Sequence, residues 1–235
     1  MITTVLFDLD GTLLPMDQDA FTRGYFKLLA AKLAPHGYEP KQLVEAIWTG
    51  TEAMVRNDGS RTNEAAFWDK FASIYGEKAK ADEPLFVDFY ANEFNQAQSI
   101  CGHAPRAAEI VHSLQKRGYR VALATNPIFP RIATENRIRW AGLEPDDFAL
   151  ITTYENSTYC KPNSAYYCEI LGKLGLKAEE CLMVGNDVVE DGAAQRLGIP
   201  VFFLTPCLIN TQGKDISAIP HGGFDELAGY LGQLN

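Results

Sequence analysis

The chain has 235 residues, of which 46% are hydrophobic and 22% charged, and its formal net charge is −9. This length suits one large domain or a core with an inserted second unit, and the composition is that of an ordinary globular protein. The acidic balance argues against a nucleic-acid partner, and no stretch approaches the roughly 20 apolar residues of a membrane span.

The first predicted strand is ITTVLFDLD at residues 2–10, which is short, rich in β-branched side chains and followed by a glycine turn. Stretches of the same character at 119–126, 148–153, 181–187 and 200–205 predict four more strands. Their centres are almost continuously apolar rather than alternating, which is typical of parallel strands covered on both faces.

Between these strands lie helical patterns at 105–118, 163–175 and 190–198, each ending near a glycine. Strand and helix therefore alternate from about residue 105 to 205, which indicates βαβ units. The predicted fold class is α/β, with a Rossmann-like parallel sheet flanked by helices.

Residues 17–100 contain no convincing strand but four apolar faces at helical spacing. The residues of these faces are Phe21, Tyr25, Leu28 and Leu29; Leu43, Ala46, Ile47 and Met54; Phe67, Phe71 and Ile74; and Phe86, Phe89, Tyr90 and Phe94. We therefore predict a discontinuous α/β core at 1–16 and 101–235, with an all-α four-helix unit inserted at 17–100.

Polar side chains collect where the predicted strands end, and in open α/β sheets ligands bind beyond those ends. The set comprises Asp8, Asp10, Thr125, Asn126, Lys161, Asn186, Asp187 and Asp191. Several carboxylates within a few ångströms stay ionised only beside a cation. Because all the ligand atoms are oxygens, a hard cation such as Mg²⁺ is the expected cofactor, and an ionised aspartate can then be a nucleophile.

Four segments in this order, DLDGT at 8–12, ATN at 124–126, KP at 161–162 and GNDVVED at 185–191, resemble the motifs of the haloacid dehalogenase-like hydrolase superfamily. The position of the insert resembles the subgroup with an α-helical cap. The resemblance implies a phosphohydrolase that removes phosphate from a small phosphorylated metabolite through an aspartyl-phosphate.

The resemblance also implies a role for each matching residue. Asp8 would attack phosphorus, and Asp10 would protonate the leaving oxygen and then deprotonate water. Thr125 would bind the phosphoryl group and Lys161 would balance its charge. Asn126 and the turn at Gly11 would assist phosphate binding.

The metal would be held by the Asp8 carboxylate, the Asp10 main-chain carbonyl and Asp187. The fourth segment departs from the usual Gly-Asp start, because Asn186 follows Gly185, so two alignments differ by one residue and pair either Glu190 or Asp191 with the usual second acid. We favour Asp187 as the metal ligand because an amide is a weaker partner for Mg²⁺, which places Asn186 and Asp191 behind it.

The polar turn RNDGSR at 56–61 makes Arg56 or Arg61 a candidate contact for an acidic substrate group, although a solvated surface charge is the simpler interpretation. The scattered cysteines and the absence of a basic, apolar leader in the first residues favour a cytoplasmic protein. Two other functions stay open: a sugar phosphomutase with the same intermediate, and a non-catalytic binding module. Dehalogenation would leave Asp10 and the metal without a use.

Overall fold

The computed structural model describes residues 1–234, so the last residue of the predicted core, 235, lies outside the described part. Five strands form one parallel sheet in the order β2-β1-β3-β4-β5. They are β1 (Thr4–Phe7), β2 (Arg120–Leu123), β3 (Cys181–Gly185), β4 (Val201–Leu204) and β5 (His221–Gly222). The predicted α/β class is confirmed, and β1 lies between two parallel neighbours as its continuously apolar sequence indicated.

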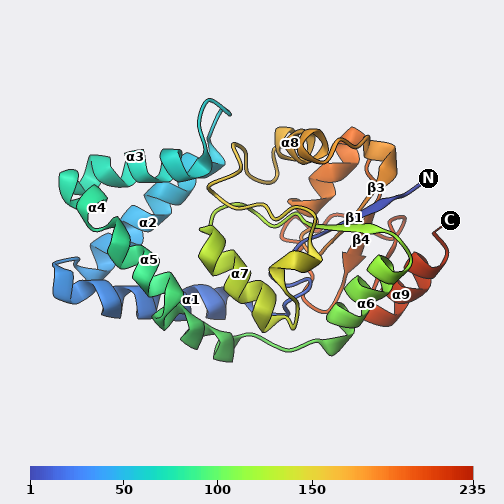
Figure 1. The fold of residues 1–235 in the computed structure, drawn as a ribbon, viewed down its shortest axis with the longest axis horizontal. Helices are drawn as coiled ribbons and strands as arrows, with labels where there is room; N and C mark the ends of the chain where they lie inside the picture. The colour runs from blue at the N-terminus through green and yellow to red at the C-terminus, as the bar shows by residue number, and fades with distance from the viewer. Residues whose placement is uncertain (235) are drawn as a thin grey trace.

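Helices cover both faces of the sheet (Figure 1). Helices α6 (Pro105–Lys116) and α9 (Phe224–Gly232) pack on one face, and α8 (Ser164–Leu174) and the 3-10 helix η5 (Asp191–Leu197) on the other. Side chains alternate along β1, so Val5 and Phe7 pack against α6 and α9, whereas Leu6 packs on the opposite face with α8 and η5. A short 3-10 turn, η4 (Ala178–Glu180), leads into β3.

Some elements differ from the sequence prediction. The stretch 148–153, predicted as a strand, pairs with β2 only through one bridge between Leu123 and Ile151. Strand β5 and helix α9 were not predicted, and neither was α7 (Arg131–Trp140), which precedes the 3-10 turn η3 (Pro145–Asp147). Helix α7 is rich in arginine, so its apolar face is weakly marked in the sequence.

Residues between β1 and α6 form a separate group of helices, shown in blue to green on the left of Figure 1. The group consists of α1 (Gln18–Leu33), η1 (Ala34–His36), α2 (Pro40–Val55), α3 (Asn63–Tyr75), α4 (Glu77–Ala81), α5 (Glu83–Ala91) and η2 (Glu93–Ile100). We call it the helical unit. Most of the predicted apolar residues are buried in it, but Ile74 is exposed and Phe94 lies in η2 rather than in α5.

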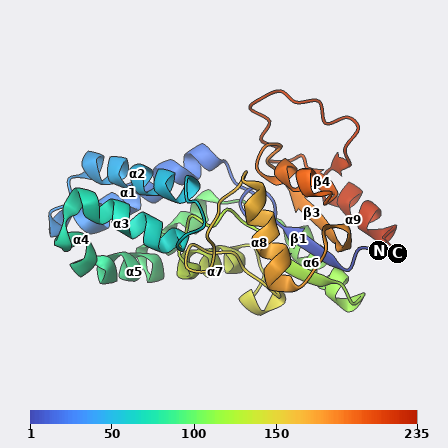
Figure 2. The same ribbon diagram turned by 90° about the horizontal axis from the view of Figure 1, so that it is seen from above.

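The helical unit and the sheet stand side by side, and α7 lies between them in both views (Figures 1 and 2). The two termini meet at the end of the molecule farthest from the helical unit. Within residues 1–234, no helix combines the length and apolar character needed to cross a membrane. The carboxyl ends of the strands face the helical unit, and the candidate site lies at this junction.

Candidate active site

The two aspartates that follow β1 lie on a tight turn at the edge of the sheet. The amide of Asp8 still donates to the Val184 carbonyl of β3 at 2.9 Å, so Asp8 is tied to the sheet. Gly11 has a φ of 84°, and a Cβ atom there would lie 2.3 Å from Nδ2 of Asn186. Only glycine therefore lets the chain turn this close to the next segment, and the turn presents Asp8 and Asp10 beyond the strand ends.

The Asp8 carboxylate has a fixed environment. Lys161 Nζ donates to its Oδ1 at 2.8 Å, and the Thr12 hydroxyl lies 3.3 Å from its Oδ2 and 2.9 Å from Oδ1 of Asn186. Burial raises the pKa of Asp8 to about 7, although the Lys161 ammonium opposes the shift and Asp191 adds to it. A further positive charge next to Asp8 would favour the ionised form that a nucleophile needs.

Lys161 is fully buried between two carboxylates. Besides Asp8, its Nζ donates to Asp191 Oδ1 at 2.6 Å. Burial by itself would lower the pKa of Lys161, but the charges of Asp191 and Asp8 raise it well above its usual range. The side chain is therefore a permanent positive charge held against one oxygen of Asp8.

Asp191 connects this lysine to the segment after β3. Its Oδ2 accepts hydrogen bonds from the amides of Asn186 and Asp187, each at 2.9 Å. A Cβ atom on Gly185 would lie 2.1 Å from the same oxygen, so the strand end and the carboxylate fit together only with glycine there. Asp191 is buried, and its hydrogen bonds order the segment that follows β3.

Asn186 and Asp187, the two candidates for the metal position, have different surroundings. The Asn186 amide is bonded at both ends, because its Oδ1 faces the Thr12 hydroxyl and its Nδ2 donates to the Cys207 carbonyl at 2.8 Å. Asp187 Oδ1 accepts the amides of Val189 and Glu190 at 2.7 and 2.8 Å. Its Oδ2 has no hydrogen-bond partner among the described residues, and Asp187 lines the cavity described below.

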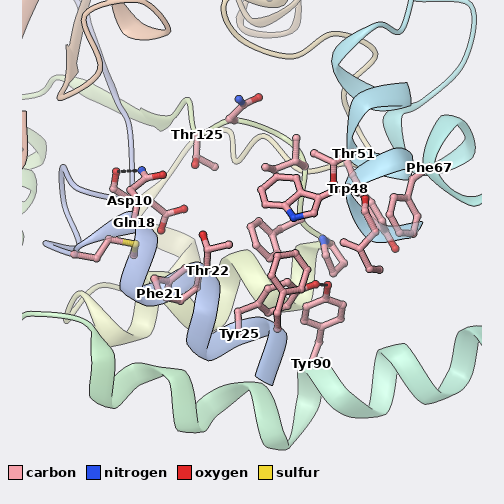
Figure 3. A pocket seen from close by; sticks show the side chains of 18 of the residues that line it. Asp10, Gln18, Phe21, Thr22, Tyr25, Trp48, Thr51, Phe67, Tyr90 and Thr125 are labelled. Atoms are coloured by element: carbon pink, nitrogen blue, oxygen red, sulfur yellow. Dashed lines mark hydrogen bonds between the residues drawn. The ribbon is translucent and has the colours of Figure 1, made fainter. Parts of the chain in front are cut away.

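Thr125 and Asn126 follow β2 at the same edge. The Thr125 carbonyl accepts the Tyr166 hydroxyl at 2.8 Å, and its side chain faces the cavity near Asp10 (Figure 3). Asn126 Nδ2 lies 3.1 Å from both carboxyl oxygens of Glu190, and its Oδ1 accepts the Lys161 amide at 3.3 Å. Burial raises the pKa of Glu190 to about 8, opposed by the charge of Lys161. Asn126 thus holds the Glu190 carboxyl at the rim of the site.

Arg137, on α7, also belongs to the site, although no motif in the sequence predicts it. Its side chain is 1% exposed, its Nη1 forms an ion pair with Asp10 Oδ2, and its guanidinium lies 4.3 Å from the centre of the Phe129 ring. Asp10 Oδ1, in contrast, is buried without a hydrogen-bond partner. Arg137 therefore fixes one oxygen of Asp10 and leaves the other without a partner among the described residues.

A cavity of about 300 Å³ opens between the sheet edge and the helical unit. The carboxylates and amides of the site line one end of it, and aromatic side chains of the helical unit line the other (Figure 3). We call the first the acidic end, formed by Asp8, Asp10, Asp187 and Glu190 with Thr125, Asn126 and Asn186, and the second the aromatic end. The arrangement places carboxyl groups and a hydroxyl around a space that can hold a phosphoryl group, with Lys161 behind Asp8.

Comparison with known proteins gives the family. The sequence pattern of the haloacid dehalogenase-like hydrolases matches residues 2–198. The chain belongs to this family. A ribulose-1,5-bisphosphate 5-phosphatase of Halopiger xanaduensis is 27% identical over 215 residues, covering 88% of this chain and 86% of that protein. A phosphoglycolate phosphatase of Yersinia pestis is 29% identical over 205 residues, covering 87% and 81%.

Solved structures agree with the fold of this hydrolase. A 2-haloacid dehalogenase from Pseudomonas syringae superimposes with a TM-score of 0.64 at 22% identity, covering 99% of each chain. At this identity the likeness shows the fold alone. The activity within the family has to be inferred from the residues of the site.

The donor atoms of this hydrolase fit a hard divalent cation. Asp8 and Asp187 offer carboxylate oxygens at the acidic end, the Asp10 main-chain carbonyl meets only Gln18 Nε2 at 3.5 Å, and Asp10 Oδ1 is buried and unpartnered. Within residues 1–234, no three His, Cys, Asp or Glu side chains form a metal cluster. Two carboxylates and one carbonyl are donor types that suit Mg²⁺, which keeps several waters and phosphate oxygens as ligands.

The predicted cap contact at Arg56 does not reach the site. Arg56 directly follows α2, its exposed side chain pairs with Glu52 at 2.7 Å, and it does not line the cavity. Arg61 pairs with Asp69 on the same outer surface, at 2.6 Å. Both are solvated surface charges. The structure thus brings together the residues predicted from the strand ends and leaves aside the one predicted from the polar turn.

Proposed function

We propose that this haloacid dehalogenase-like hydrolase is a Mg²⁺-dependent phosphatase that acts through an aspartyl-phosphate on Asp8. The observation that carries the proposal is the asymmetric environment of the Asp8 carboxylate. Lys161 holds Oδ1 at 2.8 Å, whereas Oδ2 meets, within residues 1–234, only the Thr12 hydroxyl, at 3.3 Å, and Asp8 belongs to the cavity lining. One oxygen is therefore neutralised and the other is available for attack, an arrangement that activates a carboxylate nucleophile.

The reaction that fits these positions has two steps. Asp8 Oδ2 attacks phosphorus, the ester P–O bond breaks, and Asp10 gives its proton to the leaving alcohol oxygen. Asp10 then takes a proton from a water molecule that attacks the aspartyl-phosphate, which releases inorganic phosphate and restores Asp8. Lys161 balances negative charge in both steps, and the Thr125 hydroxyl holds the phosphoryl oxygens, while the Asn126 amide keeps Glu190 in place beside them.

The cation would be held by the Asp8 carboxylate, the Asp10 main-chain carbonyl and Asp187. When bound, it neutralises phosphoryl charge and lets two anions approach each other. Asp187 is preferred to Asn186 because one of its oxygens is free of hydrogen bonds, whereas the Asn186 amide is bonded at both ends. Asn186 and Asp191 then order the loop that presents Asp187.

The helical unit, residues 17–100, acts in this proposal as a cap on the core formed by 1–16 and 101–235. Its aromatic side chains close the cavity opposite Asp8 and Asp10. An apolar wall excludes bulk water from the cavity while the substrate is bound. The phosphoryl group is then transferred to Asp8 before a water molecule attacks the aspartyl-phosphate.

The test is a covalent trap with 4-nitrophenyl phosphate and Mg²⁺. Acid quenching of the turning-over enzyme should give a phosphorylated protein that releases its phosphate in hydroxylamine, as an acyl phosphate does. Asp8→Asn should lose both the adduct and turnover, by about 1,000-fold or more, because an amide cannot attack phosphorus. Asp225→Asn changes an exposed aspartate on α9 and serves as the control. An Asp8→Asn enzyme that keeps more than a few per cent of wild-type turnover would rule the covalent route out.

A further inference from the structure

The cavity of this hydrolase is unusually one-sided in charge. Four carboxyl groups belong to its lining, Asp8, Asp10, Asp187 and Glu190, and all lie at the acidic end. Among the described residues that line it, none is a lysine, arginine or histidine. Lys161 and Arg137 approach only from behind, where they are already paired with Asp8 and Asp10. The part of a substrate that extends away from the phosphoryl group therefore meets no free positive charge.

The aromatic end is built by several helices of the helical unit together with the loop after β2. Tyr25 comes from α1, Trp48 from α2, Phe67 from α3 and Tyr90 from α5, and their side chains surround the space opposite Asp10 and Thr125 (Figure 3). Trp48 is 52% exposed although it is large and apolar, and it lies on the cavity wall rather than within a packed core. Covering such apolar surface with a ligand is favourable, because it removes the surface from water.

Polar groups at this end are neutral. The Tyr25 and Tyr90 hydroxyls are bonded to each other at 2.8 Å, and the lining also contains Thr22 and Thr51. A carboxylate or second phosphate placed here would lose its hydration without gaining a cation, and the acidic end would repel it. A neutral ring would instead pack against aromatic faces and could hydrogen bond to a hydroxyl group.

We propose, on the basis of the phosphatase function proposed above, that the substrate is a phosphate monoester of a neutral, ring-bearing alcohol. Its phosphoryl group binds at the acidic end and its ring at the aromatic end. A volume of about 300 Å³ is at the lower end of the ~300–1,000 Å³ found for ligand sites, so the alcohol carries one or two rings. This differs from the two relatives named above, since glycolate and ribulose bisphosphate bring additional anionic groups.

The test compares phosphate release from four esters in the presence of Mg²⁺: 1-naphthyl phosphate, phenyl phosphate, glycerol 1-phosphate and 2-phosphoglycolate. We expect kcat/KM for 1-naphthyl phosphate to exceed that for 2-phosphoglycolate by about 100-fold, because the site leaves an anionic alcohol unpaired. An equal or larger kcat/KM for 2-phosphoglycolate would overturn this substrate class while leaving the phosphatase function in place. The absence of release from every ester would overturn the phosphatase function itself, and the substrate class with it.

Two substitutions sharpen the result. Trp48→Ala should lower kcat/KM for 1-naphthyl phosphate about 10-fold and change that for glycerol 1-phosphate less than about 2-fold, because only the ring covers this wall. Ile74→Ala, which shortens an exposed side chain outside the cavity, is the matched control. Val87→Arg adds a cation at an exposed position on the wall. It should therefore reduce the ratio of kcat/KM for 1-naphthyl phosphate to that for 2-phosphoglycolate. Equal losses for both esters in Trp48→Ala would contradict a ring-binding wall.

Discussion

The acidic end and the aromatic end of the cavity are built on different principles. At the acidic end the side chains are held by directional hydrogen bonds and ion pairs, as when Lys161 bridges Asp8 and Asp191 at 2.8 and 2.6 Å. At the aromatic end the side chains are placed by packing, as between Tyr25 and Phe129, whose ring centres are 5.5 Å apart. Charged groups need directional partners when buried, whereas apolar rings need only close contact.

This difference separates the chemistry from the selection of the substrate. On the proposed function, the acidic end acts on any phosphoryl group that reaches Asp8 and recognises nothing beyond phosphorus and its oxygens. On the same proposal, the aromatic end recognises the alcohol and takes no part in bond breaking. Damage to the first should therefore affect every ester alike, and damage to the second should change the ratio between esters. The predictions below test this division.

The largest effect is expected from Lys161→Met. The change leaves the Asp8 and Asp191 carboxylates buried without their shared cation, which should reduce the free energy of unfolding by about 3–5 kcal/mol. Turnover should fall by about 1,000-fold with every ester, because phosphoryl charge is no longer balanced. Urea denaturation measures the loss of stability, and kcat measurements on two esters measure the loss of turnover.

Lys116→Met is the matched control, since Lys116 is exposed on α6 and should change neither quantity. Lys161→Arg keeps the charge and should recover part of the stability. A Lys161→Met enzyme that lost turnover with one ester but not with another would break the separation between chemistry and selection.

A smaller effect is expected from Arg137→Met. The ion pair orients Asp10, so its loss should lower kcat by about 10-fold for an ester with a poor leaving group. An ester with a good leaving group, such as 4-nitrophenyl phosphate, needs little proton donation and should be affected much less. The measurement is kcat for phenyl phosphate against 4-nitrophenyl phosphate. Equal losses with both would show that Arg137 supports only the fold.

Arg137 also marks the limit of what the sequence could predict. The strand ends carry their own signal, because an apolar run followed by Asp8, Thr125 or Asn186 fixes both the edge of the sheet and the polar residue. Arg137 has no such signal. It stands in a helix that reads as polar, and the partners that make its burial possible, Asp10 and Phe129, come from other segments of the fold.

The aromatic end was only half predictable for a related reason. Helical spacing identified Phe21, Tyr25 and Phe67 as apolar positions, but it could not distinguish side chains that fill a core from side chains that line a cavity. That distinction depends on how helices pack, and Trp48, on the cavity wall, was not singled out at all. The sequence instead predicted a substrate contact in the polar turn at Arg56, but the Arg56 guanidinium is paired with Glu52 on the surface.

The choice between Asp187 and Asn186 gives the next prediction. Asp187→Ala should raise the Mg²⁺ concentration for half-maximal activity by about 10-fold, because a carboxylate ligand is lost. Asn186→Ala should raise it less, since it removes a group that orders Thr12 and the Cys207 carbonyl. Mg²⁺ titrations of both variants with one ester show which of the two side chains binds the metal. The reverse ranking would assign the metal to Asn186.

The smallest effect is expected at the contact between the helical unit and two loops of the core. Asn63, at the start of α3, is fully buried and its Nδ2 lies 3.2 Å from the Pro127 carbonyl and 3.3 Å from Cys160 Sγ, while its Oδ1 accepts Asn57 Nδ2 at 3.0 Å. Asn63→Ala leaves these groups unpaired and should cost about 1–3 kcal/mol of stability. Asn92→Ala, whose side chain bonds only within α5, is the control.

The kinetic result of Asn63→Ala distinguishes two roles for this contact. If Asn63 only holds the aromatic end over the acidic end, KM should rise about 3-fold for a ring-bearing ester, and kcat should stay the same because Asp8 and Lys161 are undisturbed. The Asn63 side chain also reaches Cys160, the neighbour of Lys161, so a fall in kcat at unchanged KM would mean that the helical unit positions the lysine. In that case the two ends of the cavity would be coupled through one asparagine.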